Sequence, residues 1–369
     1  MTSLVARALG LTPQQLLDRF IPATAEHLAG VVALRRTLNA AALYKDDSAY
    51  LSWRYRFGSQ ERGRGDCWVL VLDGSVCGMV GTEEVELQRD DKRIAAWSTM
   101  DIAVDRRFEG SGLGGWMNQR LCQAAGCALT IGSNDKSRNM ITRTFRRLPD
   151  RRSYVHPIRF ERILGKRIGV PIAAHVATWL ADAAWTLYRK FVFRGTRRTF
   201  EFRSITRFDS TAADLLRRAM VPNEWCIPRS IEFLNWRLFG NSRVRYTVTG
   251  AYDQGVLAGF MATMARSNQE GPDSVALVEW QVDRALFPSV FTALCGHVVM
   301  QAVDAGAESV AVTAYHERSE RLLRHFGFVQ RLDGFETVAV YATDAQLLLE
   351  LLASAPWFLT EANTDRDNL

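Results

Sequence analysis

The sequence lacks several features that would place it in a specialised class. Its cysteines form no C-x-x-C pair, and the residues around them are apolar, so we expect reduced thiols and no metal site. The first twenty residues contain no long apolar core followed by a small-residue cleavage site, so we expect no secretion. No glycine-rich stretch continues into Gly-Lys-Ser or Gly-Lys-Thr, which argues against a Walker-type nucleotide loop. These absences favour a cytoplasmic protein. The six cysteines are Cys67, Cys77, Cys122, Cys127, Cys226 and Cys295.

Length and composition indicate a folded chain with more than one core. The chain has 369 residues, of which 47% are hydrophobic and 23% charged, a balance typical of globular proteins rather than disordered ones. Forty-six Lys and Arg against forty Asp and Glu give a formal charge of +6. That excess suits an anionic ligand or surface but does not by itself indicate nucleic acid, and we expect no nucleic-acid partner.

One glycine-rich segment predicts a phosphate pocket. It reads Arg107-Phe-Glu-Gly110-Ser-Gly112-Leu-Gly114, follows a predicted strand over 100–104 and precedes a predicted helix over 116–125. Glycine lets the backbone curl tightly and expose its amides, and the start of a helix adds unpaired N–H groups. A pyrophosphate group would therefore be bound mainly by backbone.

The chain also repeats itself. An aromatic-Leu-x-Trp-Arg sequence occurs at 50–54 and again at 233–237. Each copy is followed by a predicted hairpin, a strand that ends in Val-Asp-Arg (104–106 and 282–284), a helix, a buried strand, a short helix and a final strand. The sequence therefore predicts an α/β fold with mixed sheets, built from two tandem units. Because the Trp-Arg pair is present in both units, we interpret it as a packing feature.

The order of elements, together with the glycine loop, resembles the Gcn5-related N-acetyltransferase (GNAT) superfamily, present here twice between about 22 and 343. We predict an acyl-CoA-binding unit over 1–167, a connecting helix and linker over 168–203, and a degenerate unit over 204–369. The second unit has no glycine at the loop position (283–290) and carries Pro288 there, so we expect acyl-CoA to bind only the first unit.

The resemblance implies roles for particular residues. Acetyl-CoA or another acyl-CoA would be the co-substrate, and Asp101 the general base, unless its carboxylate instead lies at a solvated strand edge or is paired with an arginine. The tyrosine that often protonates the leaving thiolate in this family is replaced by Ile141, which leaves the acid unassigned. The residues implied for cofactor binding are Ile102, Val104, Arg107, Gly110, Ser111, Gly112, Leu113, Gly114, Asn134 and Ser137.

Three functions follow as hypotheses. The first is an acyl-CoA-dependent N-acyltransferase, acetyl before other acyl groups, acting on a small amine in a cleft between the units, where Glu83, Glu84 and Glu86 could contribute. The second is a binding or scaffold protein that has kept the fold without turnover. The third is an aminoacyl transferase of the Fem type, which also joins two GNAT-like halves.

The segment 168–188 is apolar over a membrane-like length, with His175 and Asp182 as its strongest polar interruptions. A charged residue inside a bilayer is unfavourable, so we expect a helix packed between domains rather than a span. Lysines and arginines flank it on both sides, and the alternative is peripheral contact with an anionic membrane.

Overall fold

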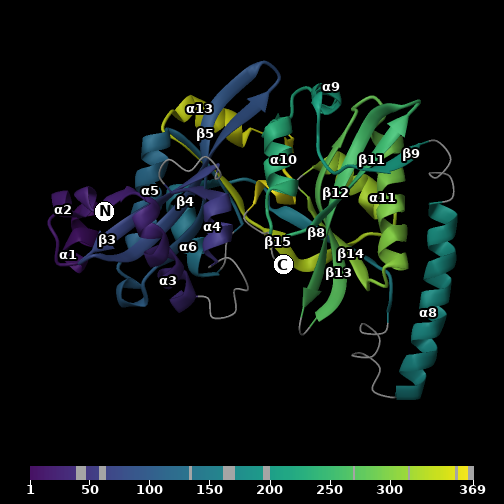
Figure 1. Cartoon of the computed structure of the whole chain (residues 1–369), viewed down its shortest axis with the longest axis horizontal. Coiled ribbons are helices and arrows are strands. Elements are labelled where there is room, and N and C mark those ends of the chain that lie inside the picture. The colour runs from purple at the N-terminus through teal and green to yellow at the C-terminus, as the bar shows by residue number, and fades with distance from the viewer. Residues whose placement is uncertain are drawn as a thin grey trace.

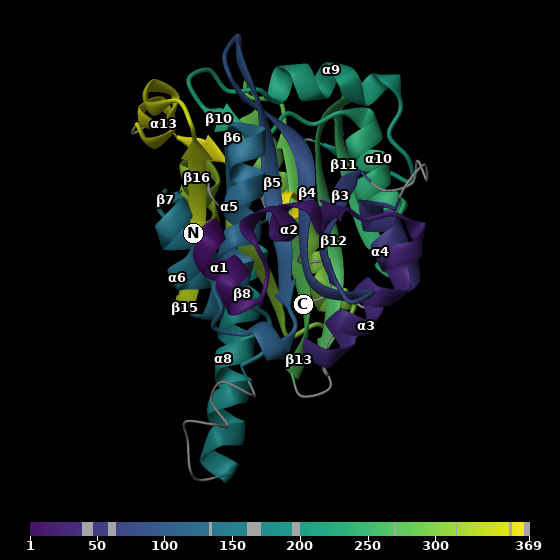
Figure 2. The same cartoon turned by 90° about the vertical axis from the view of Figure 1, so that its left-hand side faces the viewer.

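The computed structural model describes residues 1–38, 47–57, 64–132, 135–160, 171–193, 200–268, 271–314, 316–353 and 356–364. Two mixed β-sheets lie side by side, and each has helices packed on it (Figure 1). Seen end-on, the strands of the two sheets run one behind the other (Figure 2). Within these ranges, no helix has both the length and the apolar character that crossing a bilayer requires.

The elements up to the connecting helix are, in chain order, α1 (Thr2–Ala8), α2 (Pro13–Asp18), β1 (Phe20–Pro22), η1 (Ala25–His27), α3 (Leu28–Leu38), α4 (Ser48–Arg54), β2 (Tyr55–Arg56), β3 (Gly65–Leu72), β4 (Ser75–Arg89), β5 (Lys92–Val104), η2 (Arg106–Phe108), α5 (Leu113–Ala125), β6 (Cys127–Ile131), α6 (Asp135–Thr144), β7 (Arg146–Arg147), β8 (Arg151–Pro157) and α8 (Pro171–Val192).

The elements after it are β9 (Glu201–Ser204), α9 (Ser210–Ala219), β10 (Trp225–Cys226), α10 (Ile231–Phe239), β11 (Tyr246–Asp253), β12 (Val256–Asn268), β13 (Gly271–Val282), α11 (Phe287–Asp304), β14 (Ser309–Ala314), α12 (Glu317–His325), β15 (Val329–Glu336), β16 (Val338–Ala342), α13 (Ala345–Leu352), β17 (Trp357–Phe358) and η4 (Glu361–Asn363).

Both halves contain the predicted hairpin, β3–β4 in the first and β11–β12 in the second. The turns at Asp73-Gly74 and Gln254-Gly255 have positive φ at both central residues, between 46° and 84°. That geometry matches the right-handed twist of the strands they join. In both halves a glycine then lets the helix after the third strand approach the sheet. A Cβ at Gly78 would lie 2.9 Å from Met117 of α5, and one at Gly259 would lie 2.7 Å from Val290 of α11.

The two halves of the chain exchange strands near their carboxyl ends. The first sheet runs β1-β3-β4-β5-β6-β16-β7, and the second runs β15-β8-β14-β13-β12-β11-β9. Thus β8 leaves the first half and pairs with β14 and β15 of the second, while β16 returns to pair with β6 and β7 of the first. The predicted division of the chain at 167 and 203 stays a prediction. Strands β8 and β16 each belong to the sheet of the other half.

The repeated Trp-Arg motif joins the two halves. The rings of Trp53 and Trp236 stack with centroids 4.9 Å apart. Each indole N–H donates to the main-chain oxygen of the other tryptophan, at 3.3 and 3.2 Å. Arg54 lies 5.6 Å from the ring of Trp236, and Arg237 lies 5.8 Å from the ring of Trp53. The motif is therefore a packing element, as expected, and it pairs with its own copy.

Candidate functional site

The glycine loop between β5 and α5 presents a row of main-chain amides. Gly110 and Gly112 both have φ of +81°, a conformation that side chains other than glycine adopt only with strain. Within the described chain, no acceptor is found for the amides of Gly110, Gly112, Gly114 and Gly115. Free amides in a glycine loop at a helix start form a concavity that binds anions.

Neighbouring groups fix the shape of this loop. The Ser111 hydroxyl donates to the carbonyl oxygen of Phe108 (2.7 Å) and accepts from the Leu113 amide (3.3 Å). The Leu113 side chain is buried. Arg107 is held by its ion pair with Asp105 (2.9 Å) and remains exposed. A Cβ at Gly110 would meet nothing within 4 Å, which leaves open space above the amides.

The sheet splits beside the loop. Strands β5 and β6 pair in parallel only at Trp97–Ala128 and Ser98–Leu129. Beyond these pairs β5 continues for six residues on β4 alone, so within the described chain its other edge has no partner strand there. Ile102 and Val104 lie in this unpaired stretch and pack under α5. An unpaired edge next to an anion-binding loop can accept an extended ligand through backbone hydrogen bonds.

Asp101 is the residue at which β5 bulges. The register between β4 and β5 shifts there, and Asp101 has a φ of +51°. The bulge turns its carboxylate toward α3 and β2, where it pairs with Arg35 (3.1 Å) and accepts from the Tyr55 hydroxyl (2.6 Å). The carboxylate is nearly buried, with 5% of its side chain exposed. Asp101 is thus paired with an arginine, the alternative considered from the sequence, and its role as a base stays a prediction.

A cavity of about 290 Å³ opens between the two halves. One wall carries Glu83, Glu84 and Glu86 of β4, together with Arg64, which directly precedes β3. Ser98 lines the same cavity and is also the last residue through which β5 pairs with β6. The split and the cavity therefore adjoin at Ser98. The second half supplies the opposite wall, formed by Ile227, Pro228, Arg229, Ser230, Phe233, Ala362 and Asn363.

Glu83 is held within this wall. Its carboxylate lies 3.3 Å from the guanidinium of Arg54, which also contacts the Met100 sulfur at 2.8 Å. The Glu84 and Glu86 side chains are more exposed. A cavity with this acidic side can hold a protonated amine by charge and hydrogen bonding.

The turn after β13 in the second half starts like the turn after β5 in the first half, but its later residues differ. The amide of Asp105 donates to Cys77, and that of Asp283 donates to Ala258, at 2.8 and 2.9 Å. Helix α11 begins four residues after Asp283, with proline at its second position, whereas α5 begins eight residues after Asp105. Strands β13 and β14 stay paired over four residue pairs. Beyond Leu277, β13 continues to Val282 on β12 alone among the described strands, so the second half has a similar split but lacks the glycine loop.

The remaining predicted site residues lie on or near α6. Asn134 is outside the described residues, and for Ser137 only its place in α6 is described. Ile141 is 3% exposed and packs with Cys122, Ala128 and Phe145. The residue at the position of the family tyrosine is therefore part of the hydrophobic core. No group of metal-binding side chains is found among the described residues.

No protein-family model matches the sequence, and no curated protein matches it. Solved structures do. A GCN5-related N-acetyltransferase from Anabaena variabilis matches with a TM-score of 0.58 and 8% identity, over 86% of this chain and 71% of that one. Saccharomyces cerevisiae N-myristoyltransferase with bound myristoyl-CoA matches with a TM-score of 0.58 and 12% identity, over 88% and 83%. The chain has the GNAT fold in two tandem copies. A probable N-acyltransferase from Enterococcus faecalis is similar at a TM-score of 0.55 and 10% identity, over 87% of this chain and 71% of that one.

The GNAT fold confirms the expected class, α/β with mixed sheets in tandem units. Sequence reasoning missed the partners of Asp101, because Arg35 and Tyr55 are distant in the chain and carry no motif. It also missed Ser98, whose position depends on where β5 and β6 separate. The repeated Arg54 was noticed, but its contact with Glu83 could not be inferred from a repeat.

Proposed function

We propose that the protein is an acyl-CoA-dependent N-acyltransferase whose donor binds the glycine loop of the first half. One observation carries the proposal: the free amides of Gly110, Gly112, Gly114 and Gly115 lie beside a split in the sheet that adjoins an acidic cavity. The residues present fit acyl-CoA, because the amides suit a pyrophosphate and the unpaired edge of β5 suits an extended arm. Its thioester would supply the acyl group.

The acceptor is proposed to be a small amine in the cavity between the halves. Glu83, Glu84 and Glu86 would hold the protonated amine beside Ser98, where the cavity meets the split. An amine must lose a proton before it can attack, and Asp101 remains the proposed base. Arg35 and Tyr55 both contact this carboxylate directly, so a proton taken there competes with these contacts. Acetyl is the proposed acyl group, and the proposed compartment is the cytoplasm.

Titration calorimetry with acetyl-CoA and with myristoyl-CoA tests the donor site. The variants are Gly110→Val and Gly112→Val, and Gly255→Val is the matched control. All three glycines have φ between +81° and +84°, so each substitution strains the backbone by about 1–3 kcal/mol, but Gly255 lies in the β11–β12 turn of the other half. We expect binding to disappear in both loop variants and to persist in the control.

The outcomes separate the hypotheses. Wild-type affinity in both loop variants contradicts the loop assignment. Binding lost in Gly255→Val as well would show that strain, not position, is responsible. No binding of either donor by the wild type favours a scaffold or an aminoacyl transferase, and the latter would retain tRNA in a strongly salt-dependent way. The donor that binds more tightly distinguishes acetyl from longer acyl groups.

A further inference from the structure

Helix α8 packs on the second half through one face. The Trp185 indole donates to the carbonyl oxygen of Pro157 (2.6 Å), and the Tyr188 hydroxyl donates to that of His325 (3.2 Å). Asp182 accepts from the amide of Phe160 at 2.9 Å. The charged residue that interrupts the apolar segment therefore faces the protein and is satisfied there.

The opposite face of α8 is apolar and uncovered. Val176, Trp179, Leu180, Leu187 and Phe191 are between 52% and 82% exposed. At 100° per residue, their Cα positions fall within an arc of about a third of a turn. This arc lies on the side of the helix opposite Trp185. Among the described exposed side chains of α8, His175 alone is polar. Figure 1 places the helix on the outer side of the second half, away from the first.

In the sequence, the positive charge of the chain is concentrated in the segment that contains this helix. Residues 159–200 contain nine Lys and Arg and two Asp and Glu, a formal charge of +7. The whole chain carries +6, so all other residues together carry −1. An exposed apolar helix face within a strongly basic segment matches the surface of an anionic bilayer, which offers both negative charge and an apolar interior.

We propose that the exposed face of α8, defined by Val176, Trp179, Leu180, Leu187 and Phe191, docks the protein on an anionic lipid surface. The helix lies in the interface with its packed face toward the protein, as a monotopic element rather than a span. A second copy of the chain would bury the same side chains, but a segment of net charge +7 repels its own copy, whereas it attracts acidic headgroups. This proposal stands independently of acyl transfer.

Co-sedimentation with vesicles tests it. Wild-type protein is mixed with vesicles of equimolar phosphatidylcholine and phosphatidylglycerol, or of phosphatidylcholine alone. The test variant is Leu187→Asp with Phe191→Asp, and the matched control is Val329→Asp with Leu332→Asp on β15, where the side chains are 61% and 90% exposed. Both pairs place two carboxylates at exposed apolar positions.

We expect the wild type to bind the anionic vesicles, the α8 variant to bind at least about tenfold more weakly, and the β15 control to bind as the wild type does. Raising salt from about 0.1 M to about 1 M shortens the screening length from about 10 Å to about 3 Å and should weaken binding further. The proposal is overturned if the wild type does not bind anionic vesicles or if the α8 variant binds them with the affinity of the wild type. It is also overturned if light scattering shows a dimer that the α8 variant dissociates, because a second copy would then cover the face.

Discussion

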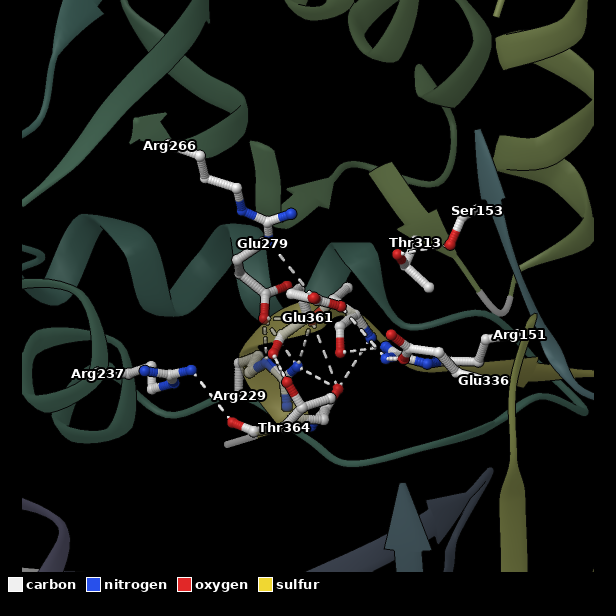
Figure 3. A network of polar contacts seen from close by, with 12 residues as sticks. Arg151, Ser153, Arg229, Arg237, Arg266, Glu279, Thr313, Glu336, Glu361 and Thr364 are labelled. Carbon is white, nitrogen blue, oxygen red and sulfur yellow. Dashed lines mark hydrogen bonds and ion pairs between the residues drawn. The ribbon is translucent and has the colours of Figure 1, made fainter. Parts of the chain in front are cut away.

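Substitution of Arg151 should strongly destabilise the whole chain. This residue of β8 is fully buried and pairs with Glu336 of β15 and with Glu361 of η4 at 3.2 Å. It also donates to the carbonyl oxygen of Thr360 at 3.0 Å. Figure 3 shows Arg151 among Glu336, Glu361 and Arg266. Glu361 has a second arginine, Arg266, at 3.5 Å. Arg151→Met would leave two buried carboxylates with one fewer counter-charge, and removing one partner of a buried pair typically costs about 3–5 kcal/mol.

The assay is equilibrium unfolding in urea, and Arg147→Met is the matched control. Arg147 pairs with Asp150 at 2.8 Å, but its side chain is 45% exposed, so its loss should cost under about 1 kcal/mol. A second variant, Arg151→Met with Glu336→Leu, should recover part of the loss because one of the two buried carboxylates that lose Arg151 is removed as well. Equal destabilisation by Arg151→Met and Arg147→Met would refute the reasoning, because the buried cluster would then contribute no more than a surface pair.

Three further predictions concern single residues. Asp101→Asn should lower turnover while leaving acyl-CoA affinity unchanged in calorimetry, and a fully active variant would remove Asp101 as base. Trp236→Ala should lower the free energy of unfolding by about 3 kcal/mol in a urea titration, since it loses the stack on Trp53, and a change below about 1 kcal/mol would show that other contacts hold the halves. Burial raises the pKa of Glu224 from 4.5 to about 7. The folded state thus keeps this proton longer than the unfolded chain, and stability from this group falls as pH rises from about 4.5 to about 7. Glu224→Gln should therefore be more stable than the wild type by about 3 kcal/mol at pH 8 and little changed at pH 4.5, and equal stability at pH 8 would contradict the assignment.

Much of the fold could be predicted from local sequence. The hairpin turns at 73–74 and 254–255, the strands ending at Val104 and Val282 and the helices after them all follow from glycine placement and apolar periodicity. The glycine loop was predictable for the same reason, because the positive φ of Gly110 and Gly112 is adopted without strain only by glycine.

The rest depends on contacts between distant residues. The pairing of Asp101 with Arg35 spans 66 positions, and the bulge that turns the carboxylate toward Arg35 leaves no mark in the residue pattern. The cavity at Glu83 requires the second half to be in place, since Arg229 and Phe233 form its far wall. Strand β8 was expected to complete its own half, and nothing in its composition distinguishes one sheet from the other.

The strand exchange has a consequence for synthesis on the ribosome. Strand β6 has only two paired residues with β5, and its main partner, β16, lies at 338–342, more than two hundred residues later. The first sheet therefore keeps an open hydrogen-bonding edge until almost the entire chain has emerged, a state in which strands tend to associate with other chains. A nascent chain stalled in the second half, or one truncated before β16, should be a substrate for chaperones even though all the residues of the glycine loop are already present.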